Sequence, residues 1–407
     1  MNKTLNIVSV TVTSFLAYFI LSAIISPLGI VSGPIATHYD VSITAATAIF
    51  SSLTTGIFIG SLIAVFVFDY LRIKSVVLLA AFLIASSLLA IYAFDSFAVL
   101  PVCLFLAGTG CGVALSSAAV VITKTYAEQY RASMLLLTDS SYSAAATFSS
   151  FLAVYLLSLD WHWWSSYLLA LAALAILILL AVFSTFPESP ATDSSAERED
   201  VSVPAQSTES IIPRWPSAVY VCGLSLLVYL LGLVTIYSWI PNYAQSVLSI
   251  PQDQAGNLVG RLFSGMFFGQ LIMFVLVMRL SARILVFICM LLATLMTISI
   301  WTDLIGLGID AIMFGLGLIG GGILKVAISY GTTLTQSASP KMVSYLLFNT
   351  ALGTAIAPAL SAWVVEGSDI GAVMVFASAC YGLATILLLI AYVLQNNHQG
   401  QPAQSNQ

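Results

Sequence analysis

Twelve apolar stretches follow one another along this chain of 407 residues, and each is long enough to cross about 30 Å of membrane hydrocarbon as a helix. Hydrophobic residues make up 60% of the sequence and charged residues only 7%, a composition typical of membrane proteins. The stretches are Val8–Gly33, Ala46–Phe68, Ser75–Phe94, Val99–Thr123, Ser133–Leu157, Trp163–Thr185, Ser217–Pro241, Ala255–Met278, Ile284–Trp301, Ile305–Leu334, Met342–Val365 and Gly371–Leu394. We therefore predict an all-α membrane protein whose twelve transmembrane helices lie in the lipid bilayer, with no separate soluble domain.

The basic residues divide unequally between the two sides of such a membrane. Ten of the twelve Lys and Arg fall on the side that holds both termini, and the opposite loops carry acids but no Lys or Arg. The ten are Lys3, Arg72, Lys74, Lys124, Arg131, Arg198, Arg214, Arg279, Arg283 and Lys341; the opposing acids are Asp40, Asp95, Asp160, Asp253, Asp303, Asp310, Glu366 and Asp369. Because loops rich in Lys and Arg remain in the cytoplasm, we predict that both termini are cytoplasmic.

A polar segment divides the chain into two similar halves. Residues 186–216 are rich in Pro, Ser, Thr and acids, which predicts a solvated cytoplasmic linker. Residues 1–185 contain six of the stretches, and residues 217–407 contain the other six and a short polar tail. The motif Gly56–Ile63 recurs 209 positions later as Gly265–Ile272. Two series of spans in the same order predict parallel six-helix repeats, related by an axis along the membrane normal.

Glycines recur in both halves at the spacing that allows helices to pack closely. The repeated glycines are Gly56 and Gly60 in the second stretch and Gly265 and Gly269 in the eighth. Each pair is four residues apart, which predicts close helix contacts; rocking of the same helices against each other is the alternative. In the tenth stretch, Gly320, Gly321 and Gly322 weaken a helix by roughly 1 kcal/mol each relative to alanine. We expect a bend there, with Gly320 and Gly322 as packing or gating positions.

Three charged residues lie inside the apolar stretches, where an ion is costly and usually faces a cavity or a partner. Asp139 lies eight residues past Arg131, about 12 Å from the cytoplasmic face, and Arg261 lies eight past Asp253, about 12 Å from the other face. Lys325 is about as deep as Asp139. One acid and two cations would make a shared cavity net positive and favour an anionic group. Alternatively, Arg261 and Lys325 extend to the interface, or Asp139 and an Arg form a structural pair.

Uncharged residues add one further candidate and exclude several classes of function. Asn349 matches Asp139 at an offset of 210 residues; a hydrogen bond between helices is the first interpretation, and a solute contact is the alternative. The sequence contains no nucleophile–base grouping and no clustered metal ligands, which argues against an enzyme, a cofactor or a metal site. It also has no basic patch for nucleic acid.

Four short segments carry a resemblance to a known family. They are Leu135–Ser140, Asp160-Trp161 with Trp163 after it, Ser238–Ala244 and Ser339–Lys341. Through them the chain resembles the major facilitator superfamily and, more narrowly, the TsgA group of bacterial inner-membrane proteins. Of the superfamily's usual signature between spans 2 and 3, only Asp69, Arg72 and Lys74 remain. The resemblance implies a transporter fold in a bacterial inner membrane, with spans 5, 8 and 10 beside a cavity between the halves; it names no substrate.

These observations favour a secondary active transporter that moves a small solute by alternating access of its two halves. We expect the proton to be the coupling ion, Asp139 to be its carrier, and the protein to be a monomer. The alternative is a transport-inactive sensor or assembly factor built on the same fold.

Overall fold

The structure, a computed structural model, consists of helices throughout its described residues. Those residues are 3–126, 128–187, 215–302, 304–335 and 340–399, so most of the predicted linker lies outside them. The first half contains α1 (Lys3–Ile25), α2 (Leu28–Tyr39), α3 (Ile43–Ala48), α4 (Phe50–Tyr70), α5 (Ile73–Ala93), α6 (Leu100–Thr125), α7 (Glu128–Ser158), the short 3-10 helix η1 (Trp163–Tyr167) and α8 (Leu168–Phe183). The second half contains α9 (Ser217–Ser246), α10 (Gln252–Val277), α11 (Ala282–Thr302), α12 (Ile309–Gly320), α13 (Ile323–Thr332), α14 (Pro340–Gly367) and α15 (Ile370–Gln399).

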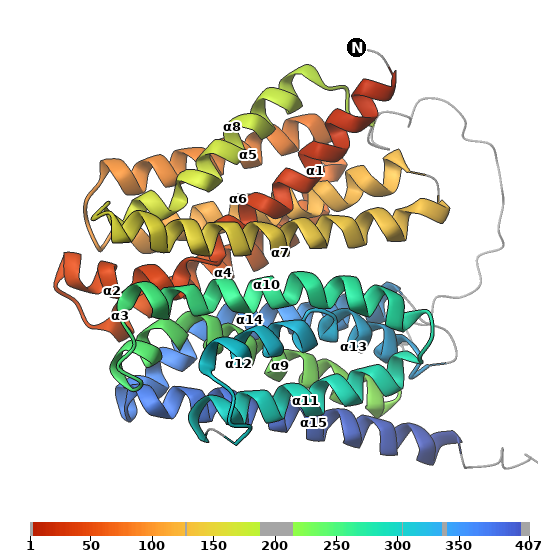
Figure 1. Ribbon diagram of the computed structural model, residues 1–407. Coiled ribbons are helices and arrows are strands. Elements are labelled where there is room, and N and C mark those ends of the chain that lie inside the picture. The colour runs from red at the N-terminus through yellow and green to blue at the C-terminus, as the bar shows by residue number, and fades with distance from the viewer. Residues whose placement is uncertain (1–2, 127, 188–214, 303, 336–339, 400–407) are drawn as a thin grey trace, which may run out of the picture.

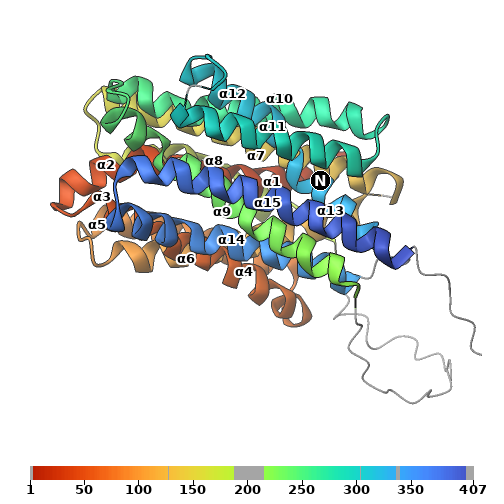
Figure 2. The ribbon, with the colours of Figure 1, turned by 90° about the horizontal axis from the view of Figure 1, so that it is seen from below.

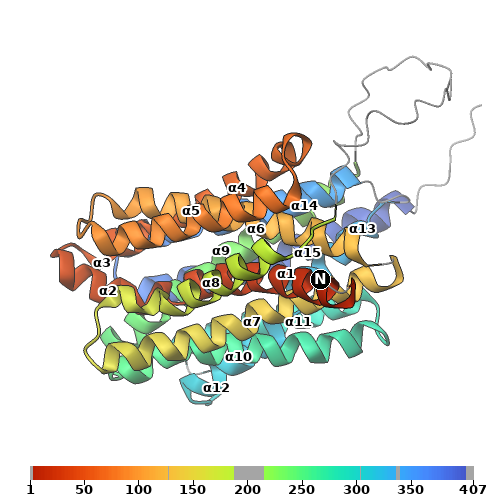
Figure 3. The ribbon, with the colours of Figure 1, turned by 90° about the horizontal axis from the view of Figure 1, so that it is seen from above.

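The helices of the two halves form two bundles that lie side by side (Figure 1). The start of α1 and the end of α15 lie at one end of the molecule, which we call the terminal end (Figures 1 and 2). The connection between α2 and α3 marks the opposite end. Helices α7 and α10, one from each half, run alongside and contact each other (Figure 3). They therefore form one seam of the interface between the halves.

Eleven of the described helical segments are long and apolar enough to cross a membrane. The predicted fifth span is not among them, although its helix α7 has 31 residues, well above the roughly 20 that a span needs. Polar residues in the segment Thr138–Ser143 lower the apolar character of α7. Polar residues in a membrane-spanning bundle usually face its interior. The count of twelve spans stays a prediction, and α7 is the helix that would complete it.

The first and the tenth predicted spans are divided at proline or glycine residues; the second and sixth also each contain two helices, α3 with α4 and η1 with α8. Ser26 and Pro27 separate α1 from α2, because proline has no N–H to donate to the preceding turn. Gly321 and Gly322 separate α12 from α13, in agreement with the bend predicted from the glycine run. The second interruption places the first turn of α13 beside the interface between the halves.

All four glycines of the repeated pairs lie where two helices meet. Gly56 and Gly60 face α6, and Gly265 and Gly269 face α12. A Cβ at any of the four would lie 2.1–2.2 Å from a backbone oxygen of the facing helix, closer than real Cβ atoms approach. The glycines therefore fit the packing prediction, and the rocking alternative stays a prediction.

Replacing Gly269 by Val is expected to destabilise the protein, because α10 and α12 would have to separate around the new side chain. Overpacking of this kind typically costs about 1–3 kcal/mol, which a lower thermal unfolding midpoint of the detergent-solubilised protein would report. Gly308→Val is the matched control, since a Cβ at Gly308 meets nothing within 4 Å. Equal midpoints for Gly269→Val and the unsubstituted protein would contradict the close contact.

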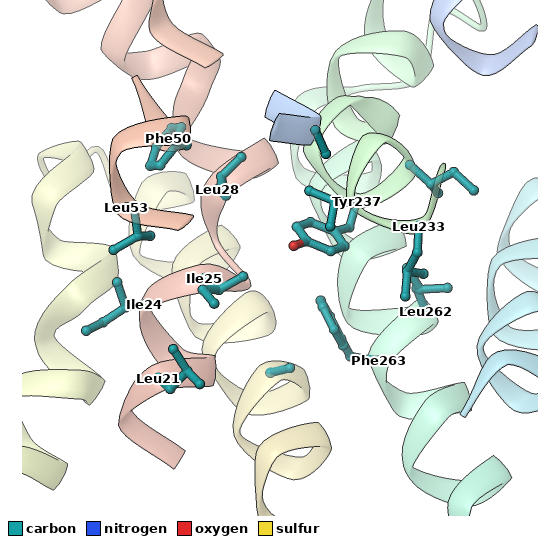
Figure 4. Packing of buried hydrophobic residues seen from close by; sticks show 14 of the residues in the cluster. Leu21, Ile24, Ile25, Leu28, Phe50, Leu53, Leu233, Tyr237, Leu262 and Phe263 are labelled. Atoms are coloured by element: carbon teal, nitrogen blue, oxygen red, sulfur yellow. The ribbon is translucent and has the colours of Figure 1, made fainter. Parts of the chain in front are cut away.

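Buried apolar side chains continue from one half into the other. In Figure 4, Tyr237 and Phe263 of the second half lie across from Leu21, Ile25 and Leu28 of the first. All five belong to one continuous cluster of buried residues. Because lipid is as apolar as these side chains, their close packing rather than a hydrophobic driving force holds the helices together.

Two polar contacts join the halves toward the opposite end. Asn242 on α9 donates from Nδ2 to Ser32 Oγ on α2 at 2.9 Å. Thr54, near the start of α4, donates from Oγ1 to the carbonyl oxygen of Ala355 on α14 at 3.1 Å. Both contacts are buried, where a satisfied hydrogen bond is worth more than one in water. The interface is therefore held together on this side of the molecule.

The first half also ties its own loops at the opposite end. His38 Nε2 on α2 lies 2.8 Å from Asp95 Oδ1 in the connection between α5 and α6. Hydrogen bonds from His38 and from Tyr39 hold the pKa of the Asp95 carboxyl below its usual value. This contact joins the end of α2 to the connection between α5 and α6.

Candidate functional site

A cavity of about 530 Å³ lies between α7 of the first half and α10 and α13 of the second, toward the terminal end. Most of its wall is apolar, formed by side chains such as Met134, Leu271 and Phe274. Its polar lining residues are Asp139, Ser140, Gln270, Lys325 and Ser329. An apolar enclosure with a few convergent polar groups is the usual form of a small-molecule site.

Asp139 and Lys325 form an ion pair inside this cavity. Asp139 projects from α7, whereas Lys325 lies in the first turn of α13, directly after the glycine interruption. Their side chains remain 26% and 39% exposed, so neither is sealed from the cavity. Because each half contributes one partner, the pair links the halves across the site. The sequence indicated that the two residues have similar depth, and the structure brings them into contact.

Pairing explains how both charges are tolerated among apolar side chains. A lone ion at this depth is expensive, and an opposite charge with good geometry offsets much of that expense. The described lining residues include one acid and one cation, so their formal charges cancel. The positive cavity predicted from the sequence counted a second cation, Arg261, which lies elsewhere.

Arg261 is on α10 but does not line the cavity. Its Nε lies 3.5 Å from Asp310 Oδ1 in the first turn of α12, and both side chains are more than half exposed. The helix geometry explains this position, because nine residues separate Arg261 from the cavity-lining Gln270 and nine residues place two side chains on opposite faces of a helix. The contact with Asp310 is the arrangement that extension of Arg261 toward an interface would give.

Gln270 is a lining residue that the sequence analysis did not single out. Its Oε1 is buried and accepts no hydrogen bond from the described residues, although a buried amide oxygen normally has a donor. A signal for it was available, because Gln270 follows Gly269 and matches Ser61 at the repeat offset of 209 residues. A polar residue at the same place in both halves predicts a shared role in lining the interface.

The remaining candidates divide between the cavity and the packing around it. Asn349 on α14 is buried and donates from Nδ2 to the carbonyl oxygen of Tyr345 in its own helix at 2.8 Å, away from the cavity lining. Gly320 accepts a hydrogen bond from the Tyr229 hydroxyl at 3.4 Å. Gly322 lines the cavity, and a Cβ there would lie 2.3 Å from a side-chain carbon of Met273.

A smaller cavity of about 280 Å³ lies between the halves at the opposite end. Its lining includes Asp160, Gln245, Gln252 and Asp253. None of the intramembrane charges predicted from the sequence lines it. The larger cavity, which Asp139 and Lys325 line, is therefore the candidate site.

Two helical bundles around a cavity with a shared ion pair define a multi-pass membrane transporter. The chain belongs to the Major Facilitator Superfamily, which it matches over residues 8–344. It is similar to Protein TsgA of Escherichia coli O17:K52:H18, with 26% identity over 402 residues that cover 97% of each chain. A TsgA homolog of Buchnera aphidicola from Acyrthosiphon pisum (strain Tuc7) is 24% identical over 389 residues, 95% of this chain and 97% of that one.

Solved structures agree on the fold. A D-xylose–proton symporter superposes with a TM-score of 0.73 at 13% identity, over 95% of this chain and 97% of that one. The nucleoside transporter NupG gives a TM-score of 0.69 at 14% identity, over 96% and 99% of the two chains. Membership of the Major Facilitator Superfamily makes the chain a transporter rather than an enzyme, as the sequence predicted. It is a multi-pass protein of the inner membrane, where transmembrane proteins are helical rather than barrels.

Proposed function

We propose that the chain couples the movement of a small solute to that of a proton, by alternating access between its two six-helix halves. The observation that carries the proposal is the Asp139–Lys325 pair, an ionisable link between the halves inside the cavity. Intramembrane acids paired with cations are typical of proton pathways in transporters. In this proposal each half has six spans, and α7 is one of the six in the first half. Both termini lie in the cytoplasm.

Protonation of Asp139 is the step that links the proton to movement of the halves. A proton on the carboxylate oxygen removes the negative charge that Lys325 faces, so the electrostatic attraction between α7 and α13 is lost. The halves can then separate or rearrange at the terminal end at a lower energetic cost. Loss of the proton restores the attraction and favours the paired arrangement. A solute that touches the same residues biases the same equilibrium, as coupling between two ligands requires.

The contacts between the halves suggest which state of the cycle the structure represents. Asn242 with Ser32, and Thr54 with Ala355, join the halves toward the opposite end, while the cavity lies toward the terminal end. With cytoplasmic termini, this arrangement is inward-facing. The anionic solute predicted from the sequence required Arg261 in the cavity; with that residue elsewhere, the balanced charges favour a solute without net charge.

Uptake by the purified protein in liposomes tests the proposal. Under an inward proton gradient of one pH unit, we expect up to about tenfold accumulation of a solute that moves with one proton, because the gradient supplies about 1.4 kcal/mol per proton. Sugars, nucleosides and small neutral amphiphiles form the panel, and a pH-sensitive dye inside the vesicles reports proton entry. Solute that only equilibrates would contradict proton coupling. A protein that moves no solute in the panel would favour the sensor or assembly factor.

A further inference from the structure

Helices α7 and α10 are in close contact along the half of their seam nearer the opposite end. A Cβ at Gly256 would lie 2.5 Å from a methyl group of Val154, and one at Gly260 would lie 2.9 Å from the ring of Phe151. The absence of a side chain at these two glycines therefore lets α10 approach α7 closely. At these positions the two helices touch, and the cavity of about 280 Å³ that Val154 and Gly256 also line opens beside the contact at the opposite end.

The same two helix faces separate farther along the seam, toward the terminal end. Leu271 lies eleven residues after Gly260, and Ser140 lies eleven before Phe151. Eleven residues are about three turns, so each pair shares one helix face, about 16 Å apart along the axis. Leu271 and Ser140 nevertheless line the cavity instead of closing the seam. The two helices touch at Gly260 and Phe151 and separate into the larger cavity toward the terminal end.

The walls of the widened seam are apolar and exposed. Leu137, Leu271 and Phe274 are 47%, 49% and 51% exposed, and all three line the cavity. Leu271 lies two residues, about 200°, from Gly269, whose face packs on α12. It is therefore directed away from the core of its own half. These exposed side chains would face lipid in a membrane, and Ser140 is the polar residue that the described seam offers beside them.

The polar groups lie behind these apolar walls. Asp139 and Lys325 satisfy and neutralise each other. Gln270 also lines the cavity, and its Oε1 is a buried acceptor without a donor among the described residues. When the amide turns toward the cavity, a ligand that supplies a neutral hydroxyl or amide N–H completes this hydrogen bond without leaving an unpaired charge there.

We propose that the seam between α7 and α10 is a side portal, through which a neutral amphiphile passes between the cavity and the membrane leaflet at the terminal end. Its apolar body contacts Leu137, Leu271 and Phe274, and its hydrogen-bond donor pairs with Gln270 in the cavity lining. This inference rests on the proposed transport function and names the class of solute. The Asp139–Lys325 pair then couples the proton to transport, and the seam between α7 and α10 selects solutes with an apolar body.

A membrane-confined photoprobe tests the portal in the full-length protein in liposomes. A phospholipid with a diazirine near the tip of one acyl chain cannot leave the bilayer, so it reaches the buried Met273 on the cavity side only through the seam. We expect labelling of Met273, in addition to the exposed Ile272 that does not line the cavity. Leu271→Trp should reduce the labelling of Met273 at least about tenfold by filling the seam, and the matched Ile272→Trp protein should keep it. Labelling that never includes Met273, or that is equal in both variants, would overturn the portal.

A pair of amphiphilic probes that differ in one hydroxyl group tests whether the ligand must donate a hydrogen bond. A long-chain primary alcohol with a diazirine should label the cavity saturably, whereas its methyl ether, which cannot donate, should require about tenfold higher amounts. Gln270→Leu should abolish that difference, and equal saturation of the two probes in the unsubstituted protein would refute the assigned class. Both measurements are made without a proton gradient. Saturable labelling without proton-driven uptake would refute the coupling and leave the portal; proton-driven uptake of a sugar, unaffected by Leu271→Trp, would refute the portal alone.

Discussion

Asp139→Asn is expected to reduce proton-driven accumulation from about tenfold, under a gradient of one pH unit, to simple equilibration. Asparagine has nearly the shape of aspartate but carries no proton that can be released, so the cavity retains its volume and loses its ionisable link. Exchange of solute across the membrane without a gradient should persist, because binding and rocking do not need net proton movement. Liposome uptake with an internal pH dye measures accumulation and proton entry together.

The matched control for this substitution is Asp310→Asn. Asp310 also faces a cation, Arg261, but the two side chains are more than half exposed and lie outside the cavity. Accumulation by the Asp310→Asn protein should match that of the unsubstituted chain. Full accumulation by the Asp139→Asn protein would show that another group carries the proton, and equal losses in both variants would point to general damage.

The sequence predicted the parts of the fold that depend on periodic, local signals. Apolar stretches of sufficient length marked the eleven qualifying spans, and the repeat offset identified equivalent glycines that do face equivalent helices. The similar depths of Asp139 and Lys325 followed from counting residues inward from the membrane surface, since helix rise is constant. That count could not supply the contact between them, because the rotation of α13 after Gly321 and Gly322 depends on packing.

The predicted height of Arg261 did not place it in the cavity. Arg261 lies nine residues, about 13 Å, nearer the opposite end of α10 than Gln270 and on the opposite helix face, so both rise and rotation keep it from the cavity lining. Gln270 was not predicted as a site residue, because an uncharged amide is less unusual in a membrane span than an ion. The division at Pro27 was missed for a different reason: the surrounding residues are apolar on both sides, so the stretch reads as one span.

A double-substitution cycle on Asp139 and Lys325 is expected to show that the pair, rather than either residue alone, stabilises the link between the halves. Asp139→Asn leaves the Lys325 charge unpaired, and Lys325→Gln leaves that of Asp139 unpaired. Breaking a fully buried pair costs about 3–5 kcal/mol; with side chains 26% and 39% exposed, we expect about 1–3 kcal/mol for each single substitution. The double variant should recover most of this loss, because no lone charge remains.

Thermal unfolding midpoints of the four detergent-solubilised proteins measure this coupling, since an interaction between two residues appears as non-additivity. The exposed pair of Arg261 and Asp310 supplies the control cycle, in which each single substitution should change stability by at most about 1 kcal/mol with little non-additivity. Additive losses at Asp139 and Lys325 would mean that the two residues act separately. In that case protonation of Asp139 could not be transmitted to α13 through their attraction, and the coupling step proposed here would fail even if the protein transports its solute.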